Sequence, residues 1–221
     1  MTESWEFGDD PEMTPQGFPW PPPEDGPILP AFAAAWKGAT FDPGRFFAGT
    51  PRDRGTGPAL LYYLSIGILV AGATLFWDSL PFYAGSAMSE SWADLGYGTV
   101  SPLVRFLLAP AFLLAGLFLS SGVVHVLLLI FSGAEHGYGT TLRVFCYANS
   151  PTLFGIVPIV GTLVGAVWSL AISIIGLREA HETDGWKAAL AVLIPVVGSM
   201  LLFAILAFAA IIATGTLLPT G

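Results

Sequence analysis

Charged residues are scarce in this chain of 221 residues, where Asp, Glu, Lys and Arg together make up 11% of the sequence. A soluble domain is about one-quarter charged, so this composition excludes an ordinary soluble protein. With 54% hydrophobic residues and a mean hydropathy of +0.70, the chain is predicted to be an all-α integral membrane protein. Four stretches have no charged residue, and each is long enough for the roughly 20-residue helix that crosses a bilayer: residues 55–77, 106–134, 144–177 and 188–221.

Cysteine and basic residues are also rare. The single cysteine, Cys146, excludes an intramolecular disulfide. The eight basic residues form no patch of the kind that binds nucleic acid, so we expect no nucleic-acid partner. Residues 1–30 hold seven acids, eight prolines and no base. This composition is unlike a signal peptide and predicts a disordered, acidic, proline-rich tail.

The stretch 144–177 predicts two crossings rather than one. As a single helix its 34 residues would measure about 51 Å, against about 30 Å for the hydrocarbon core. Pro158 and Gly161 lie in its middle and favour a tight helical hairpin, which brings the flanking Arg143 and Arg178 to one side. The sequence therefore predicts a bundle of five spans, at about 58–78, 105–131, 142–158, 161–177 and 188–213.

The positive-inside rule orients these spans. With a cytoplasmic N-terminus, seven of the eight basic residues fall inside and Arg105 alone falls outside. The C-terminus then lies outside, and the expected location is the cytoplasmic (inner) membrane. The chain divides into a tail at 1–30, an interfacial amphipathic segment at 31–54 and the transmembrane domain at 55–221. The segment 31–54 combines aromatic with basic residues, as segments in the headgroup layer do, and Pro43 should interrupt its helix.

Polar residues near the expected cytoplasmic side are the candidate site. His125 lies inside the second span, where ionisable residues are candidates for function. It has a second interpretation as a neutral histidine satisfied by a neighbouring helix. The loops add residues that form either a working surface or an ion-pair cluster, with Glu135 a candidate partner of Arg178 and Glu179 or lipid phosphate the alternative. The complete candidate set is His125, Glu135, His136, Arg143, Arg178, Glu179 and His181.

Motifs for catalysis or for binding a metal or cofactor are missing. The spacing of Glu179, His181 and Glu182 is not the H-E-x-x-H pattern that places two histidines on one helical face. We therefore expect no metal site, no cofactor and no enzymatic activity. Three prolines are predicted to break helices: Pro151, Pro158 and Pro195.

Several motifs, taken in order, resemble the Yip family of Ypt/Rab-interacting membrane proteins, in its bacterial branch. The resemblance covers about residues 40–213 and rests on 42–47 (DPGRFF), His125 with the glycine loop at 133, 142–151 (LRVFCYANSP), 156–161 (IVPIVG), Trp168 and 176–181 (GLREAH). It implies a bundle of five spans with a cytoplasmic N-terminus. Eukaryotic members bind Rab GTPases in membrane trafficking; bacterial members imply no activity for this chain.

Two functions are compatible with the sequence. The first is a non-enzymatic polytopic protein that organises protein partners or lipids at the cytoplasmic face of the membrane. The second is a small ion- or proton-coupled transporter or channel that uses His125 and the charged cluster. A scaffold should hold His125 packed and hydrogen-bonded, whereas a transporter should expose it to a hydrated cavity. The expected partners are the lipid bilayer and an unidentified membrane or cytoplasmic protein, with a homo-oligomer also open.

Overall fold

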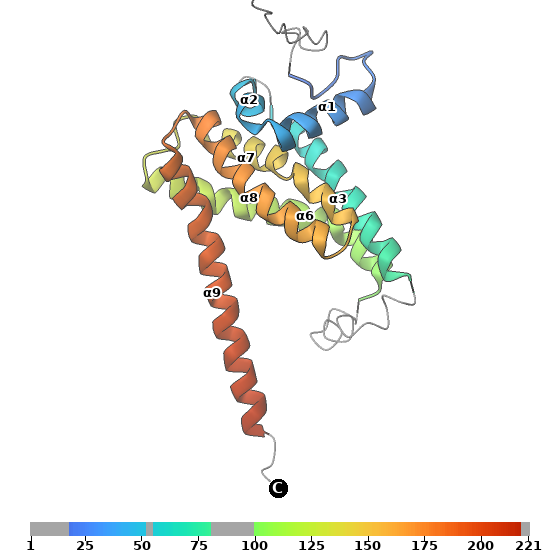
Figure 1. Ribbon diagram of the computed structural model, residues 1–221, viewed down its shortest axis with the longest axis vertical. Coiled ribbons are helices and arrows are strands. Elements are labelled where there is room, and N and C mark those ends of the chain that lie inside the picture. Colours follow the sequence, from blue (N-terminus) through green and yellow to red (C-terminus); the bar gives the residue numbers. More distant parts are fainter. Residues whose placement is uncertain (1–17, 52–54, 81–99, 218–221) are drawn as a thin grey trace, which may run out of the picture.

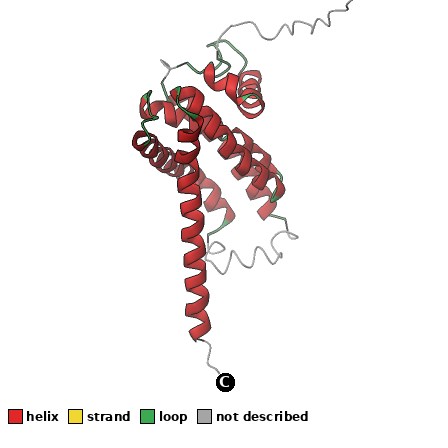
Figure 2. Cartoon of the chain, turned by 60° about the vertical axis from the view of Figure 1, so that its left-hand side comes forward, coloured by secondary structure: helices red, strands yellow, loops and turns green. Residues whose placement is uncertain are grey.

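The described part of the chain, residues 18–51, 55–80 and 100–217 of a computed structural model, is helical and contains no strand (Figures 1 and 2). Four of its helices are long and apolar enough to cross a membrane. In chain order the elements are α1 (Ile28–Phe41), α2 (Pro43–Ala48), α3 (Gly57–Asp78), α6 (Pro102–Ile130), α7 (Gly137–Ala148), the 3₁₀ helix η2 (Ser150–Ile156), α8 (Val160–His181) and α9 (Gly185–Leu217).

The predicted spans at 58–78, 105–131, 161–177 and 188–213 correspond to α3, α6, α8 and α9. Their surfaces carry many exposed Leu, Ile, Val and Phe side chains, because lipid rather than water is the solvent around them. The chain is therefore a multi-pass membrane protein in contact with lipid.

The predicted span at 142–158 is not one continuous helix. It consists of α7 and η2, which meet at Asn149. Pro151 has no N–H to continue an α-helix, and hydroxyls beside it bind the nearby carbonyls: Ser150 Oγ donates to Tyr147 O at 2.6 Å, and Thr152 Oγ1 donates to Asn149 O at 2.7 Å. Pro151 and Pro158 therefore do mark breaks, at the start and just beyond the end of η2.

The prediction that Pro195 breaks a helix is wrong, because α9 continues through it. In lipid, every interrupted backbone hydrogen bond costs several kcal/mol, so a helix that loses one bond at proline resumes rather than unwinds. The first turns of α9 pack on α6 and α8 and bury Ala188, Ala191 and Val192. The C-terminal part of α9 extends away from the other elements (Figure 1).

A hairpin does form, since α8 packs along both α7 and η2. Its close approach depends on two glycines of α8. A Cβ at Gly165 would lie 2.6 Å from the Pro151 carbonyl oxygen, and one at Gly161 would overlap the Phe154 carbonyl. These glycines have the G-x-x-x-G spacing that lets membrane helices approach closely.

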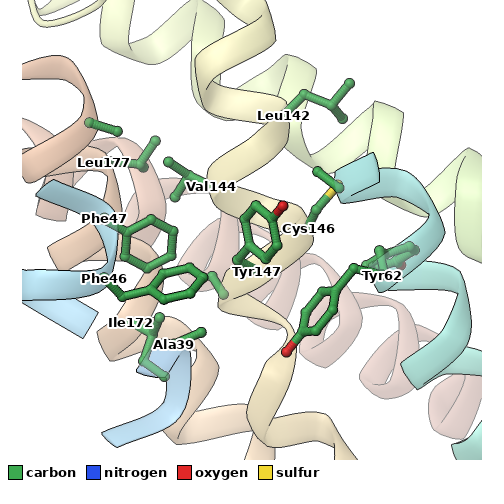
Figure 3. Close-up of a cluster of buried hydrophobic side chains, with 14 of the residues drawn as sticks. Ala39, Phe46, Phe47, Tyr62, Leu142, Val144, Cys146, Tyr147, Ile172 and Leu177 are labelled. Atoms are coloured by element: carbon green, nitrogen blue, oxygen red, sulfur yellow. The ribbon is translucent and has the colours of Figure 1, made fainter. Parts of the chain in front are cut away.

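An aromatic core lies where α1, α2, α3, α7 and α8 meet (Figure 3). Tyr147 of α7 is its centre, with ring centroids 5.3 Å from Phe46 and 5.1 Å from Tyr62. The Tyr62 hydroxyl shares a 2.7 Å hydrogen bond with Ser150 Oγ at the α7–η2 junction. The core thus stabilises the point where the helix breaks.

The two short helices α1 and α2 are separated at Pro43, as predicted from the sequence. Two tryptophans attach α1 to the bundle: Trp36 Nε1 donates to Ser150 O at 3.0 Å, and Trp168 Nε1 donates to Thr40 O at 2.8 Å. The inner face of α1 is therefore fixed on η2 and α8, and its outer face remains exposed.

The predicted disordered tail needs correction over its second half, whereas residues 1–17 lie outside the described part. Residues 18–27, here called the strap, pack on the bundle, and the rest of the predicted tail begins α1. Trp20 is 8% exposed and its indole N–H donates to Pro58 O at 2.7 Å. Composition favoured disorder, but two aromatic side chains find an aromatic surface made by distant residues.

Candidate functional site

Three histidines that are far apart in the sequence lie at one end of the bundle, here called the histidine end. His125 comes from the last turns of α6, His136 precedes α7, and His181 ends α8. The His181 ring centroid is 6.2 Å from those of His125 and His136. All three histidines are among the candidate residues predicted from the sequence. The hairpin formed by α7, η2 and α8 brings His136 and His181 together.

Thr141 links two of these histidines. Its Oγ1 is 2.9 Å from His125 Nδ1 and 2.9 Å from His181 Nε2. The other nitrogen of His181, Nδ1, accepts the backbone N–H of His136 at 3.2 Å. Thr141 and His181 are both fully buried. The result is a hydrogen-bonded chain that joins α6, α7 and α8.

The donors and acceptors give this chain a direction. A backbone N–H only donates, so His181 Nδ1 is an acceptor and the proton of the neutral ring is assigned to Nε2. That N–H donates to the Thr141 hydroxyl, which in turn donates to His125 Nδ1. One protonation state therefore satisfies both nitrogens of the buried His181 and the Thr141 hydroxyl.

Tyr138 extends the network on α7. Its ring lies against His125 with centroids 5.6 Å apart, and its hydroxyl is 3.0 Å from Ser121 Oγ of α6. His136 faces the α8–α9 connection, where its Nε2 is 3.6 Å from a carboxylate oxygen of Glu182. His125 is thus packed and hydrogen-bonded.

A family comparison now identifies the chain. The family model described as the Yip1 domain matches residues 37–212, which include the end of α1, all of α2 to α8 and most of α9. The chain belongs to the Yip1 family. The family resemblance stated from the motifs is confirmed. Comparison with curated proteins finds no match. Comparison with solved structures finds none either.

Within the Yip1 domain, the candidate residues do not lie in one cluster as expected. Arg143 is 8% exposed and donates to Pro51 O at 2.9 Å and to Thr140 Oγ1 at 3.2 Å. It lies on the side of α7 that faces α2, beside a cavity of about 20 Å³ that Glu179 also lines. A volume of this size holds about one water molecule.

Arg178 does not pair with Glu135. Its Nε donates to the carboxylate of the adjacent Glu179 at 3.0 Å, and its Nη2 contacts the same oxygen. The Arg178 side chain is 51% exposed, so this pair contributes little to stability. Glu135 is exposed and has no ion pair among the described residues. Glu135 is therefore not the partner of Arg178, because the guanidinium of Arg178 binds the carboxylate of the adjacent Glu179.

Metal binding finds no support in this geometry. Among the described residues, no group of three or more His, Cys, Asp or Glu side chains is placed to hold a metal ion. His181 also uses both ring nitrogens in hydrogen bonds, which leaves it no lone pair for a metal.

Sequence reasoning missed Thr141 and one ion pair. Thr141 is an uncharged residue in the predicted loop before the span at 142–158, and only its position opposite two histidines gives it a role. At the other end of the bundle, Arg105 Nη2 is 2.6 Å from Asp78 Oδ2, and both side chains are about one-fifth exposed. A signal for this pair existed, since the two charges flank the same connection at the ends of consecutive spans.

Proposed function

We propose that this Yip1-family protein is a non-enzymatic membrane protein of the cytoplasmic membrane that organises protein partners or lipids at its cytoplasmic face. The observation that carries the proposal is the outer face of α1 and α2. The large apolar side chains of Ile28, Leu29 and Phe41 are exposed on α1, and Lys37 of α1 and Arg45 of α2 are exposed as well. Exposed apolar and basic side chains on two short helices attached to the bundle suit the boundary between acyl chains and anionic headgroups.

The proposal includes five crossings, with α7 and η2 together as the third. The 12 residues of α7 measure roughly 18 Å and the 7 residues of η2 roughly 14 Å. Placed end to end, the two helices are close in length to the thickness of a bilayer core. Trp77 Nε1, at the end of α3, donates to Ile156 O, at the end of η2, at 2.8 Å. This bond supports α7–η2 reaching as deep as the full-length helix α3.

Labelling of single cysteines in intact cells tests this topology. With Cys146 replaced by alanine, we expect Glu135→Cys and Asp184→Cys to react only after the membrane is permeabilised, and Val157→Cys to react from outside. Residues 135 and 184 are exposed at the histidine end, and residue 157 is exposed at the turn before α8. Protection of Val157→Cys on both sides would mean that α7–η2 enters the membrane without crossing it.

The lipid-binding surface predicts a charge-dependent result. Lys37→Glu combined with Arg45→Glu should reduce the anionic lipid that co-purifies in mild detergent at least about threefold, because each base near an anionic surface contributes about 1 kcal/mol. Mass spectrometry of the bound lipids and proteins measures the change. The matched control, Lys37→Arg with Arg45→Lys, keeps both charges and should behave as wild type. Equal recovery of lipids and proteins in both double variants would reject α1–α2 as the working surface.

A proton-coupled transporter is the second candidate, and the chain from His181 through Thr141 to His125 is the observation in its favour. A hydrogen-bonded chain of this kind has the geometry that proton transfer requires. It ranks second because His181 is fully buried and His125 is packed against Tyr138. Proton flux into proteoliposomes that is lost in Thr141→Val would reverse this ranking.

A further inference from the structure

Two aromatic side chains attach the strap to the bundle. Phe18 lies against Phe46 and Tyr147, with centroids 4.7 Å and 5.4 Å away. Trp20 lies against Phe32 and Tyr62, with centroids 6.1 Å and 6.0 Å away. We call these four partner rings, together with the Pro58 carbonyl that accepts the Trp20 N–H, the aromatic seat.

The backbone of the strap contributes no bond to the seat. Five of its ten residues are proline and lack an N–H. Among the described residues, its backbone hydrogen bonds lie within the strap, from Gly26 N to Pro23 O at 2.8 Å, and at its junction with α1, where Ala31 N donates to Pro27 O at 3.4 Å. The strap therefore binds as a proline-rich peptide does, through side chains that enter aromatic surroundings, and not as an element of the fold.

The seat and its occupant also differ in their relation to the family. Phe46, Tyr62, Tyr147 and Pro58 lie within residues 37–212, which match the Yip1 domain, whereas the strap precedes that match. A cavity of about 10 Å³ remains between them, lined in part by Phe18, Pro21 and Pro58. The aromatic surface is thus mostly part of the domain, and the strap covers it.

We propose that the aromatic seat is a binding site for a proline-rich segment of a partner protein, with two aromatic residues at positions i and i+2, and that the strap occupies it in the absence of the partner. This inference rests on the proposed function and names the surface and the kind of partner. Proline-rich segments lose little conformational entropy on docking, which favours recognition by a small aromatic surface. The covalent link gives the strap an effective concentration in the millimolar range, so a competing partner binds in exchange with it.

Peptide binding to the full-length protein in detergent tests the seat. The probe is a fluorescent peptide of residues 15–27, and the variant combines Phe18→Ala with Trp20→Ala so that the strap no longer competes. Fluorescence anisotropy should show saturable binding to this variant, and binding to wild type at least about tenfold weaker. Trp186→Ala, which removes an exposed tryptophan of α9 beyond the seat, should match wild type. A peptide with both aromatics replaced by alanine should not bind.

Several results would overturn the proposal. One is that the peptide shows no saturable binding to a monodisperse double variant. Another is that the peptide binds the double variant and the wild type with equal affinity. A dimer that forms by exchange of straps, seen by light scattering, would assign the seat to a second copy instead. If binding fails while α1–α2 keeps its charge-dependent lipids, the seat is rejected and the proposed function stands.

A second experiment avoids any loss of folding in the variant. A protease site between Gly26 and Pro27 of the otherwise wild-type chain allows the strap to be cut after purification. We expect the cut strap to remain bound through size-exclusion chromatography and to be released by excess unlabelled peptide, but not by the peptide that lacks both aromatics. Immediate loss of the strap on cleavage, or retention that excess peptide does not change, would contradict a displaceable ligand.

Discussion

Alanine at Gly161 or Gly165 should lower the free energy of unfolding by about 1–3 kcal/mol, the usual cost of an overpacked core. A Cβ at either position meets a backbone carbonyl of η2, from Phe154 or Pro151. A carbonyl in a helix cannot turn aside as the end of a flexible side chain does, so α8 and η2 must separate. Thermal unfolding of the purified protein in detergent measures the loss.

Gly198 provides the matched control for these glycines. It also lies in a membrane helix, but a Cβ there has nothing within 4 Å. Gly198→Ala should leave the melting temperature unchanged or raise it slightly, because alanine favours a helix by about 1 kcal/mol over glycine. If all three variants melt alike, the close contact between α8 and η2 does not limit stability.

Removing the Thr141 hydroxyl should have the second large effect. Valine keeps the shape of threonine but leaves His181 Nε2 and His125 Nδ1 without their shared partner. A buried polar group that loses its partner costs about 1–3 kcal/mol, and the fully buried His181 should bear most of this cost. Chemical or thermal unfolding of Thr141→Val in detergent measures it.

Two variants separate this effect from the general loss of a hydroxyl. Thr141→Ser keeps the oxygen and should retain most of the stability. Thr74→Val removes an exposed hydroxyl that bonds only its own helix, at Val70 O, and should stay within about 0.5 kcal/mol of wild type. Equal stabilities of Thr141→Val and Thr141→Ser would show that the hydroxyl does not hold the histidines.

Long uncharged stretches determine helices in a membrane protein because lipid leaves the backbone no other way to satisfy its hydrogen bonds. For this reason α3, α6, α8 and α9 follow directly from the sequence. The break near Pro151 and the end of α1 before Pro43 follow for a local reason, the missing N–H of proline. Pro195 shows the limit of that rule, since α9 does not break there.

The site was predictable in its members but not in its contacts. An ionisable residue in an apolar stretch, such as His125, is visible in a sequence because its burial is costly. Which group satisfies it depends on helix rotation and on depth across the bundle. Thr141, which meets His125 and His181, therefore had no signal of its own, and the structure pairs Arg178 with Glu179, the alternative to Glu135.

The sequence by itself determined that this chain is embedded in lipid. It also determined the ends of most helices and the polar residues that are unusual in a membrane. Each of these properties depends on the solvent and on local backbone chemistry. The tertiary structure alone decided that the strap packs on the aromatic seat, that the three histidines meet, and that the α7–η2 break is stabilised by Tyr62. Those outcomes depend on contacts between residues far apart in the sequence, and Phe18 and Tyr147 are more than a hundred positions apart. Composition and periodicity describe a segment and its solvent, and they carry no information about which distant surface will cover it.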